Sequence, residues 1–313
     1  MDLRTLQKLQ RDTGFNVDFI EKAHHITRIL SEISENRELG KNLALKGGTV
    51  LNFVYLDIPR LSIDIDLNFV GALEKGEMLG LRPHISEGIQ HLAEKLGYEA
   101  VMKPSSYIID RFLLKYPTLK GTRDSIKVEI NYLERASFVG NVKRDFKHFF
   151  TDIPKFKVNT YTVEEICAMK TKAMVERLYA RDIFDMYNIS KLELKKEVAK
   201  KLMVLYMLMA KKRPEVKTLV SKIRRCEDKE IIRQVAQFVR QGYAVNATTV
   251  KRRVADFYES VFKLDSNDRK FLKRIEDGIV ELDVLFDGIR YNKEAQKHPS
   301  LCYALKRGQK SFK

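Results

Sequence analysis

LALKGGTVLNFVYLDIPRLSIDIDLNFV, residues 43–70, decides the fold prediction, because two adjacent glycines are followed by two aspartates one residue apart in an apolar segment. Residues two apart in a β-strand point to the same face, so Asp64 and Asp66 project together if residues 62–70 form a strand. Two carboxylates about 4 Å apart repel by roughly 4 kcal/mol at an effective dielectric near 20. A hard cation such as Mg²⁺ or Mn²⁺ would offset that repulsion. We therefore predict a metal site at these aspartates.

A third carboxylate follows in SIKVEINYL, residues 125–133, where Lys127, Glu129 and Asn131 share one face of a predicted strand. If this strand lies beside residues 62–70, Glu129 completes a cluster able to hold two metal ions. Such clusters bind the attacking and leaving oxygens in phosphoryl and nucleotidyl transfer. The alternation alone is equally consistent with a solvent-facing Glu129.

The glycines predict an anion-binding turn. Gly47 and Gly48 follow a short apolar strand and precede a helix that begins at Thr49 or Val50, so bare backbone amides at a helix N-terminus can meet a phosphate. Thr49 is expected to serve as the N-cap and to offer its hydroxyl to a phosphate oxygen. KGGT is not a Walker A loop, because the lysine precedes the glycines.

The chain of 313 residues is long enough for two domains. Periodicity predicts helices at 19–35, 49–56 and 85–99 and strands at 43–46, 62–70, 106–117 and 125–133. Beyond residue 162 the pattern is almost wholly helical. We predict an α/β (α+β) fold, with a mixed sheet and flanking helices in residues 1–155 and an α-helical bundle in residues 156–313.

The charge is strongly and unevenly basic. Lys and Arg number 58 against 42 Asp and Glu, a net charge of +16. Residues 191–260 hold 18 Lys/Arg and 8 Asp/Glu, so 18 − 8 = +10 lies there, with peaks at 211–213, 224–225 and 251–253. This surplus favours a polyanionic partner such as nucleic acid or nucleotide, with contacts to phosphate rather than to bases. A solvated helical surface without a partner would show the same pattern.

The remaining composition predicts a cytoplasmic protein. Its 3 cysteines are scattered without metal-ligand spacing, which fits a reducing compartment. The longest apolar helical run, residues 202–210, is far shorter than the roughly 20 residues that span a bilayer, so no membrane partner is expected. The N-terminus has no apolar signal-peptide core. No pattern indicates an oligomeric state.

The glycine turn and the D-x-D strand together resemble the nucleotidyltransferase-fold superfamily. Within it, KGGTVLNFVYLDIPRLSIDIDL closely resembles the first motif of the AbiEii/AbiGii abortive-infection toxin family, which runs K-G-G-[ST]-x-L, R-x-S and D-I-D-L. Arg60, Ser62 and residues 64–67 fit this pattern. Ile63 departs from it, because Glu or Lys is commoner there.

A second segment, EEICAMKTKAMVERLYARDIFDMYNI at 164–189, resembles another motif of that family, E-x-x-x-x-x-K-x-x-A…R…R-D-x-x-D. The matching residues are Lys170, Ala173, Arg177, Arg181, Asp182 and Asp185. On one continuous helix, Lys170, Arg177, Arg181 and Asp185 fall within about 80° of one another and form a cationic stripe opposite an apolar side. An ordinary amphipathic helix with a solvated face would look the same.

The resemblance implies a metal-dependent nucleotidyltransferase that transfers a nucleoside monophosphate from a nucleoside triphosphate (NTP) to a hydroxyl. It also implies the toxin of a toxin–antitoxin or phage-defence pair, with a cognate antitoxin as partner. Some members of the family are similar to enzymes that extend the 3′ end of tRNA. The expected acceptor is therefore tRNA or another RNA.

The resemblance also implies roles for individual residues. The metal ligands would be Asp64, Asp66 and Glu129. The phosphate- and nucleotide-binding residues would be Gly47, Gly48, Thr49, Arg181 and Asp185. Lys170 would neutralise charge that develops in the transition state, and Asp182 would orient the nucleotide or brace Lys170.

Two other functions fit the same fold. One is a catalytically silent module that binds nucleic acid or a partner protein, although such a module has no physical reason to retain two repelling aspartates. The other is a nucleotidyltransferase acting on a small molecule. Salt separates this last function from RNA modification, because only RNA binding weakens steeply as salt rises.

Overall fold

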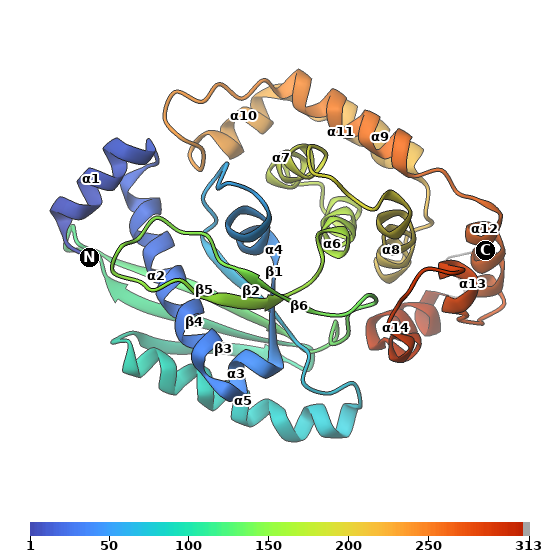
Figure 1. Ribbon diagram of the computed structural model, residues 1–313, viewed down its shortest axis with the longest axis horizontal. Helices are drawn as coiled ribbons and strands as arrows, with labels where there is room; N and C mark the ends of the chain where they lie inside the picture. The colour runs from blue at the N-terminus through green and yellow to red at the C-terminus, as the bar shows by residue number, and fades with distance from the viewer. Residues whose placement is uncertain (309–313) are drawn as a thin grey trace. The chain divides into compact units, whose positions relative to one another are not determined.

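A computed structural model describes residues 1–308, with the backbone alone for residue 105 and residues 306–308. The predicted helical part, 156–313, thus ends in residues that lie outside the described chain. The chain forms two compact units, each built from separate stretches (Figure 1). The first comprises Met1–Arg135, Asn141–Tyr161 and Gln237–Tyr243. The second comprises Ala136–Gly140, Thr162–Ala236 and the chain from Ala244 onward.

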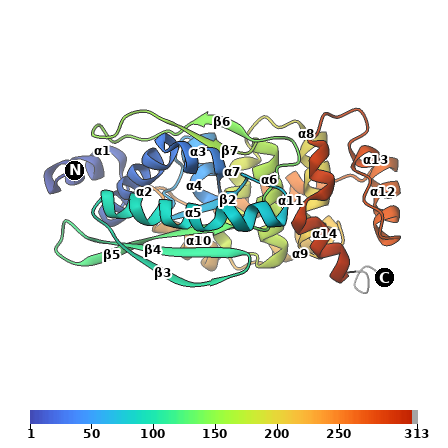
Figure 2. The ribbon, with the colours of Figure 1, turned by 90° about the horizontal axis from the view of Figure 1, so that it is seen from below.

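The first unit is an α/β structure. Its helices are α1 (Leu3–Thr13), α2 (Val17–Glu35), α3 (Arg37–Asn42), α4 (Gly47–Val50), which continues as a π-helical turn over Leu51–Tyr55, and α5 (Lys75–Lys95). Its strands are β1 (Leu43–Lys46), β2 (Asp64–Phe69), β3 (Glu99–Ser106), β4 (Ile109–Pro117), β5 (Arg123–Asn131), β6 (Val142–Asp145) and β7 (Lys157–Thr160). Figures 1 and 2 show α5 on one side of the sheet and α4 on the other.

The strands form one mixed seven-stranded sheet in the order β3-β4-β5-β2-β1-β7-β6. The central pair β2 and β5 runs parallel, whereas β1 pairs with β2 antiparallel. Ile65, Leu67 and Phe69 are buried, and Asp64 and Asp66 alternate with them as the sequence pattern predicts. The predicted fold class, a mixed sheet with flanking helices and a helical bundle, is confirmed.

Some element predictions were wrong. The helix expected at 85–99 begins at Lys75 and contains Pro83, and the chain beyond it forms β3. The short edge strand β6 and its neighbour β7 were missed, because four residues are too few to show a reliable period.

A short segment from within the helical half of the sequence belongs to the α/β unit. In Gln237–Tyr243, the Phe238 carbonyl accepts a hydrogen bond of 2.8 Å from the Leu61 backbone N–H. The Phe238 ring packs on Phe19 with ring centroids 4.8 Å apart, and Arg240 lies over the Phe15 ring at 5.4 Å. This segment therefore completes the core beside α1 and α2.

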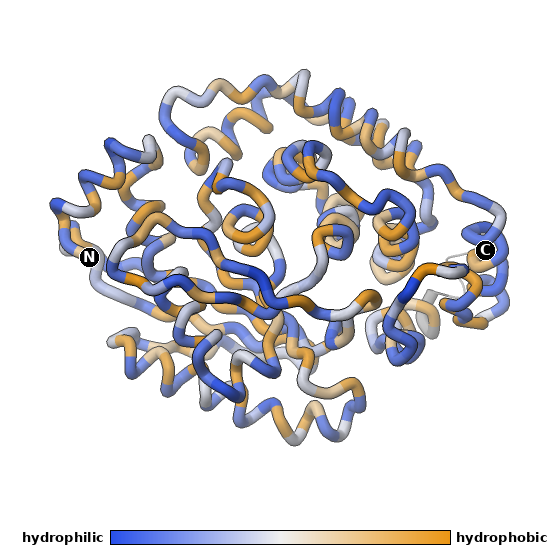
Figure 3. The backbone as a smooth tube through the Cα atoms, viewed as in Figure 1, coloured by the Kyte–Doolittle hydropathy of each residue, from blue (hydrophilic) through white to orange (hydrophobic). Residues whose placement is uncertain are grey.

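The second unit is helical. Its helices are α6 (Val163–Glu176), α7 (Ala180–Ile189), α8 (Lys196–Met209), α9 (Val216–Arg225), α10 (Asp228–Ala236), α11 (Ala247–Val261), α12 (Ser266–Glu276), α13 (Leu282–Phe286) and α14 (Pro299–Gly308), with a 3₁₀ turn at Lys293–Lys297. The hydropathy view in Figure 3 shows hydrophilic and hydrophobic residues alternating along α11, as expected for an amphipathic helix.

Helix α8 is the core of this unit. All of its residues from Ala199 to Met209 are buried, and α6, α11, α13 and α14 pack around it. The apolar run that the sequence shows at 202–210 is therefore the centre of a bundle. Among the described residues, no helix combines the length and the hydrophobicity that crossing a membrane requires.

Candidate active site

The glycine turn between β1 and α4 lies against Asp66. Gly47 has φ +77°, a conformation that favours glycine, and a Cβ atom there would lie 2.5 Å from the Asp66 Oδ2. A Cβ atom on Gly48 would lie 2.8 Å from the Arg60 Nη2 and 3.1 Å from the Ser62 Oγ. A side chain at either position would therefore crowd its neighbours: at Gly47 the Asp66 carboxylate of β2, and at Gly48 the side chains of Arg60 and Ser62.

Thr49 does not cap the helix, and this prediction was wrong. The N-cap position is Lys46, and Thr49 lies within α4 with its side chain buried. Its hydroxyl donates to the Asp64 carbonyl oxygen at 2.5 Å, and its oxygen also lies within hydrogen-bond distance, 3.0 Å, of the Ser62 hydroxyl. Thr49 therefore joins the glycine helix to the first residue of β2.

The three predicted carboxylates come from neighbouring strands. Asp66 on β2 lies directly opposite Glu129 on β5, and Asp64 lies opposite Lys127. Lys46 at the end of β1 lies opposite Asp66 on the other side. The central strands therefore bring acids and lysines together on one face of the sheet.

Burial and charge act in opposite directions on these acids. Burial raises the pKa of Asp66, and the neighbouring Asp64 and Glu129 carboxylates also raise it, whereas Lys46 and Lys127 lower it. Burial also acts to raise the pKa of Glu129, but Lys127 and Arg111 outweigh it and the net pKa is lowered. Glu129 Oε2 lies 3.3 Å from the Lys127 Nζ and 3.4 Å from the Arg111 Nε.

These contacts decide how a metal ion fits. Among the described residues, no three acidic, histidine or cysteine side chains are arranged to hold a metal ion as they stand. Asp64 and Asp66 fit a divalent cation, because their oxygens are hard ligands on one face of a strand and the half-buried Asp66 carboxylate gains from positive charge. Glu129 is engaged with two cations and would have to leave them to become a ligand.

The second motif forms a separate cluster in the helical unit. Lys170 on α6 lies 3.1 Å from the Asp182 Oδ1 and 2.6 Å from the Asp185 Oδ2, both on α7. Arg177 Nε lies 3.1 Å from the other Asp182 oxygen. Lys170 and both aspartates are buried, and Arg181 on α7 is half-buried.

The prediction of one continuous helix over 164–189 was wrong, and with it the prediction of a cationic stripe along one side of that helix. Helix α6 ends at Glu176, Leu178 adopts φ +49°, and α7 begins at Ala180. The break turns α7 back so that its aspartates meet Lys170. An amphipathic period continues across such a break without showing it.

Sequence reasoning did not predict the ion pairs that surround the acids. The sequence places Lys127 on the same strand face as Glu129, two residues before it, and that spacing could have indicated the ion pair. Arg111 could not have been found from the sequence, because its contact depends on the register that pairs it with Glu129 across β4 and β5.

Comparison with solved structures and with families identifies the fold. MenT4, a nucleotidyltransferase toxin from Mycobacterium tuberculosis H37Rv, is similar with a TM-score of 0.67 and 14% sequence identity, covering 99% of this chain and 99% of that chain. At this identity the likeness concerns the fold alone. No curated protein matches the sequence.

The family model described as nucleotidyl transferase AbiEii toxin, type IV TA system, matches residues 28–265. The matched region includes both the glycine–aspartate segment and the α6–α7 motif. It spans most of the chain, and the resemblance seen in the sequence is confirmed: the chain belongs to the AbiEii family of nucleotidyltransferase toxins of type IV toxin–antitoxin systems.

Proposed function

We propose that this toxin is a metal-dependent enzyme that transfers a nucleoside monophosphate from an NTP to the 3′ end of tRNA or another RNA. The observation that carries the proposal is the pair Asp64 and Asp66, held on one face of β2 against the glycine turn. Burial and the neighbouring Asp64 and Glu129 carboxylates disfavour a charged Asp66, and a bound cation would offset that cost.

We assign the metal ion to Asp64 and Asp66. Glu129 would be a third ligand if it left its ion pairs with Lys127 and Arg111. Magnesium or manganese, when bound, neutralises charge on the triphosphate and holds the reacting oxygens in line. The backbone N–H groups of Gly48 and Thr49, in the first turn of α4, donate hydrogen bonds to phosphate oxygens of the NTP. Thr49 also fixes the position of the Asp64 backbone through its hydroxyl.

Lys170 supplies positive charge to the transferred phosphoryl group in this proposal. Asp182 and Asp185 hold its ammonium group in a defined position, so that little reorganisation is needed during the reaction. Arg181 contacts the nucleotide. Inside the cell, a cognate antitoxin of the type IV pair would restrain this activity.

The test incubates the purified protein with each labelled NTP, Mg²⁺ and total RNA. Label should enter RNA, and a chelator should abolish the transfer. Asp64→Asn should lower the rate at least about 100-fold, as loss of groups that organise a metal site does. Asp57→Asn, which changes an exposed carboxylate in the same segment, is the matched control and should retain activity.

Other outcomes separate the alternatives. Label found on a small molecule and not on RNA would make this a small-molecule nucleotidyltransferase. If no acceptor takes up label and Asp64→Asn is as toxic to cells as the wild type, the proposed catalysis is wrong.

A further inference from the structure

Much of the basic charge of residues 191–260 is used inside the helical unit. Lys200 and Lys201 are buried and pair with Asp265 and Asp268 at the start of α12, at distances of 2.7 to 3.3 Å. Lys251 pairs with Asp228. These lysines join helices to one another and are not available to a partner.

The charge that remains is concentrated on α9 and the turn before it. Residues 211–225 contain seven Lys/Arg and one Glu, so 7 − 1 = +6 lies in this short stretch. Lys212, Lys217, Lys222 and Arg225 are exposed, and none of them has an ion pair with any residue that the structure describes. Their charges are therefore free for a ligand.

The fold fixes this arrangement of cations. Helix α8 ends with Lys211 in the left-handed conformation at φ +56°, and the Lys212 N–H donates to the Met207 carbonyl oxygen at 3.0 Å. This closed turn leads into α9, whose Leu219, Val220 and Ile223 are buried against the bundle. The apolar side of α9 therefore anchors the helix and leaves its cations outside.

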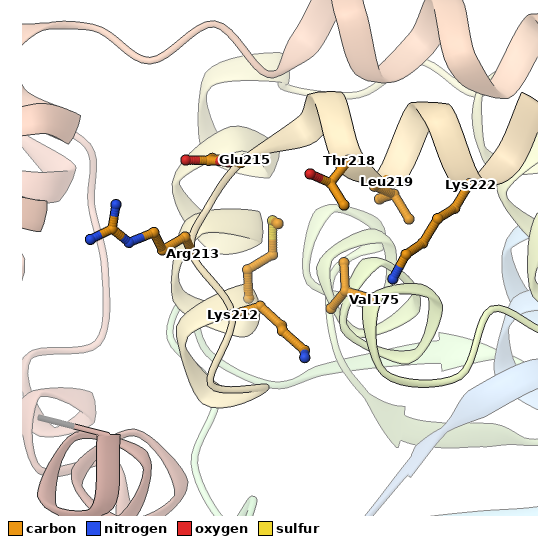
Figure 4. A pocket seen from close by; sticks show the side chains of 8 residues that line it. Val175, Lys212, Arg213, Glu215, Thr218, Leu219 and Lys222 are labelled. Carbon is orange, nitrogen blue, oxygen red and sulfur yellow. The ribbon is translucent and has the colours of Figure 1, made fainter. Parts of the chain in front are cut away.

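Two hollows flank α9. One, of about 210 Å³, is lined by Val175, Met207, Lys212, Arg213, Glu215, Thr218, Leu219 and Lys222. Figure 4 shows the Lys212 and Lys222 side chains reaching this hollow from two segments, with Arg213 directed away from them. The other, of about 270 Å³, is lined by Lys217, Val220, Ser221, Arg224, Arg225 and Glu259. Cations and a hydroxyl thus meet in each hollow.

We propose that α9 and the turn at 211–213 bind the sugar–phosphate backbone of the RNA acceptor, with phosphates near Lys212 and Lys222 in one hollow and near Lys217 and Arg225 in the other. This inference rests on the proposed transfer to RNA. A ten-residue helix is about 15 Å long, which spans about four phosphates of a stacked strand at about 3.4 Å each.

RNA fits this surface better than an acidic protein does. Protein interfaces depend on large apolar or aromatic side chains at their centre. Throughout residues 211–225, all of which the structure describes, no large hydrophobic side chain is exposed. Residues 211–225 themselves contain no aromatic side chain, and the exposed Tyr303 ring lies near them at Lys211, whose Nζ is 5.2 Å from its centroid. The contacts of the four free cations with phosphate should therefore be independent of RNA sequence.

The test measures binding of labelled RNA hairpins with single-stranded 3′ ends, without NTP, over a range of salt concentrations. The variant replaces all four free cations of this surface with glutamine: Lys212, Lys217, Lys222 and Arg225. The control removes the same charge from exposed positions elsewhere in the helical unit: Lys196, Lys229, Lys270 and Lys273. Thermal unfolding checks that both variants fold.

Each lost phosphate contact should reduce the slope of log K against log salt by about 0.7 to 0.9, so the α9 variant should lose about 3. The loss should be equal for hairpins of different sequence, and the control should keep nearly the wild-type slope. Equal slopes in the two variants overturn the inference. Binding of polyglutamate is measured in parallel. If the α9 variant loses binding to polyglutamate but keeps wild-type binding to RNA, the inference is also wrong, and an acidic polypeptide partner is indicated. Transfer assays with short oligonucleotides report on catalysis separately, because these substrates need few backbone contacts.

Discussion

Gly47 shows how closely a single residue can control the site. Any side chain there must adopt φ +77° and also displaces the Asp66 carboxylate, because its Cβ would lie 2.5 Å from Oδ2. We expect Gly47→Ala to lose at least about 1–2 kcal/mol of stability from the backbone conformation alone and to lose nucleotidyl transfer through the shift of Asp66. Unfolding in urea and the transfer assay measure the two effects.

Gly97 provides the control for this prediction. It has φ +81°, but a Cβ atom there would have no heavy atom within 4 Å. Gly97→Ala should therefore lose a similar amount of stability from strain and keep its transfer activity. Equal activities of the two alanine variants would contradict the proposed role of the glycine turn.

At the scale of elements, the contact between α6 and α7 depends on a buried ion cluster. Lys170→Met removes the ammonium group that pairs with the buried Asp182 and Asp185 carboxylates. Removing one partner of a buried ion pair typically lowers the free energy of unfolding by about 3–5 kcal/mol. Replacing the two aspartates with asparagine in the same chain removes the uncompensated charge. This triple variant should recover most of the lost stability, as measured by urea unfolding.

Activity then separates structure from chemistry. If the cluster contributes to catalysis, the triple variant remains inactive although it is stable. Recovery of both stability and transfer would mean that Lys170, Asp182 and Asp185 serve the packing of α6 on α7 alone.

The elements also show what a sequence can predict here. The alternation in residues 62–70 and 125–133 was enough to put Asp64, Asp66 and Glu129 on two strands and to suggest that these strands are neighbours, as β2 and β5 are. Local periodicity does not encode the left-handed Leu178 or the register that brings Arg111 to Glu129. Those features are set by tertiary packing, so the ion pairs of the site emerged only with the structure.

At the scale of the whole molecule, the buried Glu165 carboxylate holds the short segment Ala136–Gly140 in the helical unit. Glu165 on α6 accepts hydrogen bonds from the Ser137 hydroxyl at 2.5 Å, the Phe138 N–H at 2.9 Å and the Tyr206 hydroxyl at 3.2 Å. Ser137 and Phe138 belong to Ala136–Gly140, which lies in sequence between two stretches of the α/β unit. Burial raises the pKa of Glu165 to about 7, although these hydrogen bonds oppose the shift.

This shift predicts how stability varies with pH. The folded protein holds the Glu165 proton up to about pH 7, whereas the unfolded chain releases it near the ordinary glutamate pKa of 4.5. The stabilising contribution is therefore full below pH 4.5 and lost as pH rises through 7. Glu165→Gln has no carboxyl group at this position, so its stability lacks this pH dependence. Its unfolding free energy relative to wild type should rise between pH 4.5 and 7 by up to about 3 kcal/mol. Urea unfolding across that range measures the difference, and a constant difference would contradict the assignment.

The Gln237–Tyr243 segment has a consequence for synthesis of the toxin. Because the buried Phe238 completes the core beside α2, a nascent chain cannot finish the α/β unit until the helical stretch Thr162–Ala236 has been synthesised. A message cut short upstream of this segment would yield an incomplete catalytic half. We expect such fragments to be inactive in the transfer assay.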